Sequence, residues 1–78
     1  MTWAVIIKDE ISDPDSLRDL AFEASRQFGA SDRWVYWDEY RTEGLAFCFQ
    51  WDIAAVLFAA KCAYRGIKFE RDWPQNSN

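Results

Sequence analysis

The chain has 78 residues, half of them hydrophobic, and a formal net charge of −4. This length accommodates one domain, and its five Trp, three Tyr and six Phe are more aromatic side chains than a disordered chain carries. The lack of histidine removes the commonest general base and the commonest neutral metal ligand. A pI near 4.6 also argues against binding nucleic acid through its phosphates.

The chain begins with a predicted strand and helix. Residues 2–8 form a β-branched, apolar run of strand length, with apolar side chains expected on both faces. Asp13 is predicted as the N-cap of a helix that begins at Pro14. Gly29 is the natural end of this helix.

The middle of the chain predicts two strands in a hairpin. Residues 33–38 are aromatic and β-branched, which favours a strand. Residues 39–43 are polar and precede Gly44, as in a hairpin connection. Residues 45–51 give the strongest strand signal, because large apolar side chains alternate with smaller ones.

The last third predicts a helix and a short strand. Asp52 is expected to cap a helix over residues 53–65, which Gly66 ends. A strand over residues 67–69 or slightly beyond follows, and residues 75–78 are expected to be a frayed tail of a single domain over 1–74. The order strand, helix, strand, strand, helix, strand predicts an α+β fold, a ferredoxin-like sandwich with two helices on one face of an antiparallel sheet.

The helix over 53–65 is apolar all round. We expect one stripe to face the core, namely Ile53, Val56, Leu57, Ala60 and Tyr64. The opposite side is also apolar and consists of Ala54, Ala55, Phe58, Ala59 and Cys62. This outer face predicts a protein contact or a homodimer seam centred on Phe58. The alternative is that the alanines only favour the helix and that the tail covers Phe58.

The charge is unevenly distributed. Residues 1–52 carry eleven acids and five bases, a net of −6, whereas residues 53–78 carry two acids and four bases, a net of +2. The acids form two clusters, Asp9, Glu10, Asp13 and Asp15 in the first loop and Asp38, Glu39 and Glu43 near the hairpin. We expect these clusters at opposite ends of the sheet. Helix-dipole complementarity explains Asp13 and Asp15, but the second cluster favours docking on a basic surface.

The residues that common enzymatic and metal chemistry needs are missing from the sequence. No metal, cofactor or catalytic site is predicted, since two separated cysteines and no histidine make neither a ligand set nor a nucleophile–base pair. Cys48 and Cys62 lie in apolar runs and are interpreted as reduced, structural residues. With no leader and no membrane-length apolar run, we expect a cytoplasmic protein.

The element order and the run from Gly44 to Phe49, leading into an Ala-rich helix, resemble an RNA-recognition motif. Gly44, Ala46 and Phe47 match the third-strand pattern of that family, whereas Glu43 replaces its basic residue and Leu45 its first stacking aromatic. This resemblance implies the ferredoxin-like fold and, as an alternative function, a nucleic-acid-binding module.

In size, acidity and lack of catalytic groups the chain is also similar to phage-encoded anti-CRISPR inhibitors. That resemblance implies a non-enzymatic, stoichiometric inhibitor that docks on the basic, nucleic-acid-binding surface of a partner protein, without direct contact to nucleic acid. The predicted partner-binding residues are Asp9, Glu10, Asp13, Asp15, Trp34, Tyr36, Asp38, Glu39, Glu43 and Phe58.

Overall fold

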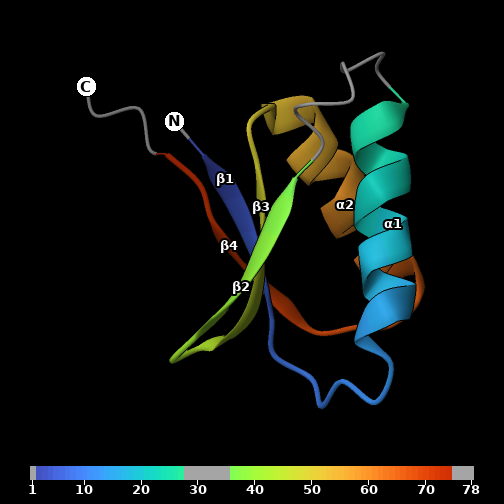
Figure 1. The fold of residues 1–78 in the computed structure, drawn as a ribbon, viewed down its shortest axis with the longest axis vertical. Helices are drawn as coiled ribbons and strands as arrows, with labels where there is room; N and C mark the ends of the chain where they lie inside the picture. Colours follow the sequence, from blue (N-terminus) through green and yellow to red (C-terminus); the bar gives the residue numbers. More distant parts are fainter. Residues whose placement is uncertain (1, 28–35, 75–78) are drawn as a thin grey trace.

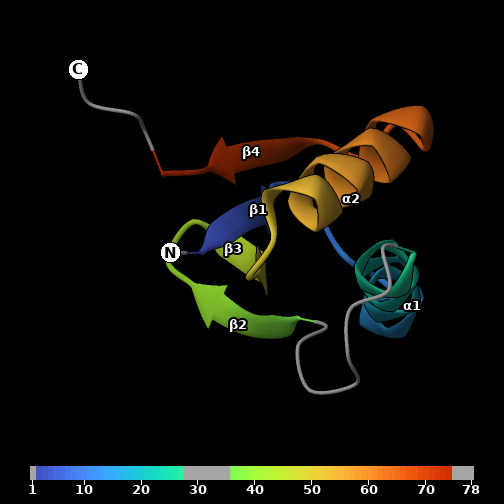
Figure 2. The same cartoon turned by 90° about the horizontal axis from the view of Figure 1, so that it is seen from above.

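The computed structural model describes residues 2–27 and 36–74. The elements are, in chain order, β1 (Trp3–Ile7), α1 (Pro14–Arg26), β2 (Trp37–Arg41), β3 (Gly44–Phe49), α2 (Asp52–Tyr64) and β4 (Phe69–Asp72). The strands form one antiparallel sheet in the order β2-β3-β1-β4, and both helices lie against the same face of it (Figures 1 and 2). This architecture confirms the predicted α+β, ferredoxin-like fold.

The two central strands supply most of the sheet's buried surface. In the β1–β3 pairing, Val5 lies opposite Phe47 and Ile7 opposite Leu45, and all four side chains belong to the core between sheet and helices. The alternation predicted for both strands is confirmed, because the intervening residues form a second buried cluster on the other side of the sheet. We call this other side the open face.

The first helix begins as predicted. Asp13 is its N-cap, with Oδ1 accepting a hydrogen bond from the Ser16 backbone N–H at 3.3 Å, and Pro14 is the first helical residue. A capping carboxylate satisfies an N–H group that has no partner within the helix. The helix ends at Arg26, and the predicted stop at Gly29 lies outside the described residues.

The hairpin differs from its prediction. Strand β2 runs over Trp37–Arg41, so part of the expected polar connection is strand and only Thr42 and Glu43 form the turn. Residues 33–35 lie outside the described part of the chain. Polar and charged side chains are compatible with β2 because it is an edge strand, where charges oppose pairing with other chains. Gly44 is required at the start of β3, because a Cβ there would clash with the carbonyl oxygen of Ile7 and its φ is +146°.

The orientation predicted for the second helix is wrong. The face buried in α2 is Ala54, Ala55, Phe58, Ala59 and Cys62. Of the stripe expected in the core, Leu57 is partly buried against it, and the other four residues are exposed. Small side chains allow the helix to lie close to the sheet, and Phe58 fills the remaining space against Phe47 and Phe49, with ring centroids 5.0 and 5.3 Å away. A helix that is apolar all round has no polar face to indicate its orientation.

The end of the chain follows its prediction with shifted bounds. Gly66, with φ +73°, ends α2 as expected, since glycine adopts the left-handed conformation without a Cβ penalty. Strand β4 begins at Phe69 and extends to Asp72, later than predicted. The predicted tail at residues 75–78 lies outside the described residues. In the part that is described, no helix is long and apolar enough to cross a membrane.

Candidate functional site

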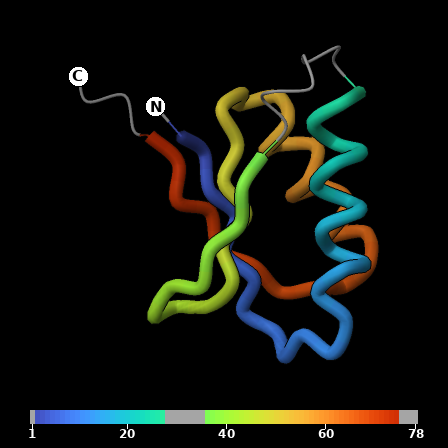
Figure 3. The backbone as a smooth tube through the Cα atoms, in the orientation of Figure 1, coloured from blue at the N-terminus to red at the C-terminus, as the bar shows by residue number. Residues whose placement is uncertain are grey.

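Several acidic side chains meet at one end of the sheet. Because β1 and β3 are antiparallel, the end of β1 lies beside the start of β3, with Ile7 opposite Leu45. Lys8 Nζ donates a hydrogen bond to the carbonyl oxygen of Glu43 at 3.1 Å, and the β1–α1 loop and the β2–β3 turn lie at the same end of the fold (Figures 1 and 3). The prediction that the loop and the hairpin lie at opposite ends is therefore wrong.

We call the group of Asp9, Glu10, Asp13 and Glu43 the acidic end. Asp9 Oδ2 accepts a hydrogen bond from the Lys68 backbone N–H at 2.7 Å, and Asp13 holds the start of α1 through Ser16. Within residues 2–27 and 36–74, none of these four carboxylates forms an ion pair. Their charges are therefore available to a partner.

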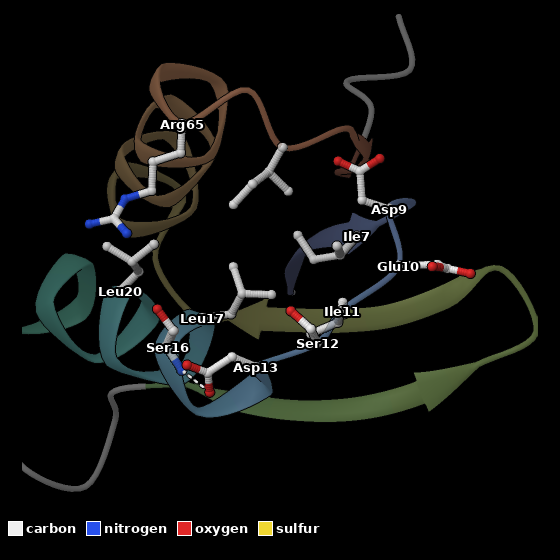
Figure 4. A pocket seen from close by; sticks show the side chains of 11 residues that line it. Ile7, Asp9, Glu10, Ile11, Ser12, Asp13, Ser16, Leu17, Leu20 and Arg65 are labelled. Atoms are coloured by element: carbon white, nitrogen blue, oxygen red, sulfur yellow. Dashed lines mark hydrogen bonds between the residues drawn. The ribbon is translucent and has the colours of Figure 1, made fainter.

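A cavity of about 230 Å³ opens at this end, between the β1–α1 loop, α1 and the connection from α2 to β4 (Figure 4). Its apolar lining is Ile7, Ile11, Leu17, Leu20 and Ile67. Its polar lining is Asp9, Glu10, Ser12, Asp13, Ser16 and Arg65. In Figure 4 the Arg65 guanidinium lies beside Leu20, across the cavity from Asp9 and Glu10. The sequence analysis missed this cavity, because no local pattern joins Arg65 and Ile67 to a loop more than fifty residues earlier.

The predicted residues Asp15 and Asp38 are engaged within the fold. Arg18 of α1 forms ion pairs with Asp15 at 3.1 Å and with Asp38 of β2 at 3.2 Å. Hydrogen bonding to Asp38 is the main reason that the pKa of Arg18 is raised. Asp38 is only 21% exposed, so this carboxylate ties β2 to α1 and does not belong to the acidic end.

The predicted aromatic anchors do not form one surface. Tyr36 is half-buried and packs on Phe47 and Phe49, with centroid distances of 5.9 and 6.0 Å. Burial is the main cause that raises the pKa of Tyr36. Phe58 is fully buried, which contradicts its prediction as the centre of an exposed contact. Trp34 lies outside the described residues.

Glu39 lies on the open face in a network of charged side chains. Arg41 forms ion pairs with Glu39 at 2.8 Å and, across the sheet, with Asp72 at 3.2 Å. The hydrogen bond from Arg41 is the main cause that lowers the pKa of Glu39. Beneath this network lie the buried side chains Ala4, Ile6, Ala46 and Cys48.

The two cysteines are free and buried, one on each side of the sheet. Cys48 Sγ lies 3.4 Å from Arg41 Nη2 and 3.6 Å from Glu39 Oε1. Burial raises the pKa of both Cys48 and Cys62 to about 11. Both thiols are therefore protonated at neutral pH, which is unfavourable for nucleophilic chemistry.

The residues that resemble an RNA-recognition motif do not form a base-stacking surface. Bases stack on aromatic side chains of the sheet in that family, but Leu45 and Phe47 face the helices and are at most 2% exposed. The fold that the resemblance implied is present, whereas its stacking positions on β3 point into the core.

The outer face of α2 is a second candidate surface. Ile53, Val56 and Tyr64 are 53%, 50% and 93% exposed. A shallow apolar groove of about 300 Å³ runs over this face and is lined by Asp52, Ile53, Val56, Leu57 and Ala60. Homodimerisation through the outside of this helix stays a prediction. Phe58 is buried and cannot be the centre of such a contact, so the contact would involve the exposed residues of this groove. The helical spacing in the sequence correctly placed these apolar residues on one face of the helix, but that face was expected to pack on the core.

A search of residues 2–27 and 36–74 finds no group of three or more acidic or cysteine side chains arranged to hold a metal ion. Comparison of the chain with protein-family models, with curated proteins and with solved structures finds no match in any of the three.

Proposed function

We propose that the protein is a non-enzymatic binding module that docks its acidic end on a basic surface of a partner protein. The observation that carries this proposal is the convergence of Asp9, Glu10, Asp13 and Glu43 at one end of the sheet, without ion pairs to the described residues. Such uncompensated charge steers the encounter with a surface of opposite sign and penalises partners of like charge.

The acidic end is also partly organised before binding. Asp9 and Asp13 each accept a backbone hydrogen bond, so less side-chain freedom is lost when a partner engages them. Lys8, which directly precedes Asp9, forms an ion pair with Glu70 at 3.3 Å and donates a hydrogen bond to the carbonyl oxygen of Glu43. Residues 9–15 contain four acids and no base, so the loop presents a single sign of charge.

The proposal extends to inhibition. A module that covers a basic, nucleic-acid-binding surface of an effector blocks that surface stoichiometrically, without any catalytic group. This is the mode of action that the resemblance to phage-encoded anti-CRISPR inhibitors implies. The partner is then recognised by its Lys and Arg side chains, and the acidic end mimics the charge of a nucleic-acid backbone.

Binding of a labelled nona-arginine peptide, measured by fluorescence anisotropy, tests the proposal. The double variant Glu10→Lys/Glu43→Lys is expected to bind about tenfold more weakly than the wild type in low salt. The matched control is Asp19→Lys/Asp52→Lys, which changes the net charge equally at two exposed sites outside the acidic end. The affinity of the control variant for the peptide is expected to fall about twofold, and the difference in affinity between the two variants should shrink at high salt.

Equal losses in the two double variants would show that only net charge matters, and would overturn a localised docking surface. Tighter binding of single-stranded RNA than of the arginine peptide would overturn the proposal in favour of a nucleic-acid-binding module. Circular dichroism of each variant controls for folding.

A further inference from the structure

We propose that the cavity at the acidic end receives one long basic side chain, a lysine or an arginine, from the partner protein. This inference rests on the proposed function and names the contact through which the docking becomes specific. It is carried by the cavity between loop, α1 and the α2–β4 connection, which combines an apolar floor with a rim of oriented carboxylates.

The floor of the cavity suits the stem of such a side chain. Ile7, Leu17 and Leu20 are at most 6% exposed, and they line the cavity together with the partly buried Ile11 and Ile67. Lysine and arginine bury their methylene stems along apolar surface while the charged group stays at a polar rim. A short polar side chain would not cover the remaining exposed apolar atoms of Ile11 and Ile67, and a purely apolar one would bury the rim carboxylates without a partner.

The rim suits the charged group. Asp9 uses Oδ2 for the Lys68 backbone N–H and Asp13 uses Oδ1 for the Ser16 backbone N–H, so each carboxylate is held in place with its other oxygen available. In Figure 4, Glu10 lies beside Asp9 with its carboxylate turned outward, and Asp13 lies at the start of α1 beside Ser16, so Asp9 and Asp13 supply the oriented oxygens of the rim. These oxygens accept hydrogen bonds from an ammonium or guanidinium group, and charge-assisted bonds are stronger than neutral ones.

Arg65 places a positive charge on one side of the cavity, opposite the carboxylates. Its guanidinium lies on the side opposite Asp9 and Glu10, and it has no ion pair with any described residue. A cationic group is therefore repelled from the α2 side and attracted to the loop side. An incoming basic side chain is expected to place its charged end toward the loop, away from Arg65.

Peptides that differ in one side chain test this inference. Short alanine-rich peptides carry lysine, diaminopropionic acid or norleucine at the central position, and their affinities are measured by two-dimensional NMR titration of the labelled protein. In a mildly acidic buffer, which protonates its side-chain amine, diaminopropionic acid has the charge of lysine on a much shorter stem, and norleucine has a comparable stem without charge. The lysine peptide is expected to bind about tenfold more tightly than either of the others, because only lysine uses both floor and rim.

A steric variant provides a second, charge-neutral test. Ser12→Phe places a bulky ring at the cavity lining and is expected to reduce the affinity for the lysine peptide about tenfold. The matched control Thr42→Phe lies at the exposed hairpin turn of the same end, outside the cavity, and is expected to change nothing measurable. Neither change alters the charge of the acidic end, so binding of nona-arginine should survive in both variants.

The outcomes separate the two proposals. Equal affinities for the lysine and diaminopropionic acid peptides, or equal effects of the two Phe variants, would overturn the cavity while leaving acidic docking in place. Binding of norleucine as tightly as lysine would also overturn it. Failure of the wild type to bind nona-arginine would instead overturn the proposed function, and with it this inference.

Discussion

The open face of the sheet and the outer face of α2 are both apolar surfaces that no helix covers. The centre of the open face is buried, with Trp37 at its β2 edge 46% exposed, whereas the centre of the α2 face is open to water. On the open face, Ala46 and Cys48 are fully buried. On α2, Ile53 and Val56 are about half exposed. The two surfaces differ in the size of their residues and in the reach of the charges beside them.

The central residues of the open face are mostly small, and Arg41 extends over them from one edge strand to Asp72 on the other. The outer face of α2 carries branched and aromatic side chains that project into solvent. The nearest helical base, Lys61, points away from this face, because it pairs with Glu23 of α1 at 3.8 Å. Whether an apolar patch is exposed to water therefore depends on the neighbouring side chains that cover it as well as on its own composition.

Placing the same large side chain on each face is expected to give the largest difference between them. Ala46→Phe must displace the network above it or the sheet itself, and is expected to lower the free energy of unfolding by about 1–3 kcal/mol. Ala60→Phe, on the exposed face of α2, is expected to change it by less than about 0.5 kcal/mol. Urea unfolding measures both, and similar costs would contradict the distinction between covered and uncovered faces.

Removing the cover of the open face has a smaller expected effect. Arg41→Ala loses two ion pairs and the stem that covers the buried cluster, and is expected to destabilise the fold by about 1 kcal/mol. Cys48 should also become more accessible to iodoacetamide in the folded protein. The matched control Arg65→Ala removes an arginine that has no ion pair with the described residues, and should leave both quantities unchanged. Unchanged alkylation of Cys48 in Arg41→Ala would show that Arg41 is not its cover.

At neutral pH the two thiols are expected to have no effect on stability, and their contribution appears only at higher pH. The pKa of Cys48 and of Cys62 is raised to about 11 in the folded protein, above the value of about 8.5 in an unfolded chain. Between these values the folded state binds more protons than the unfolded state, so stability is complete below about pH 8 and falls as the pH rises toward 11. Urea unfolding of the wild type and of Cys48→Ala/Cys62→Ala measures the difference. A steeper loss in the double variant than in the wild type would contradict the assigned shifts.

Much of the fold follows from local patterns in the sequence. Alternation in β1 and β3 predicted both faces correctly, because the side-chain period of a strand is two and each strand is long enough to show it. Asp13, Pro14 and Gly66 marked helix ends through their own backbone chemistry. The end of β2 was missed, because the charged residues Glu39 and Arg41 resemble a turn and become a strand only beside β3.

The candidate site was predicted less well. Asp9, Glu10, Asp13 and Glu43 were among the residues predicted to bind a partner, but their convergence at one end depends on the antiparallel pairing of β1 with β3. Asp38 was grouped with them by its position in the chain, whereas Arg18 draws its carboxylate toward α1. Arg65 and Ile67 were not predicted to line the cavity, because they reach it only where the end of α2 and the α2–β4 connection lie beside the β1–α1 loop.

The order of the elements, the faces of the central strands and the lack of histidine chemistry can all be read from residue identity and local period. Only the tertiary structure decided which side of α2 is buried, since both of its stripes are apolar and the choice depends on how closely small residues let the helix approach the sheet. The tertiary structure also brought the loop acids to the hairpin turn, because strand pairing joins residues that are distant in the chain.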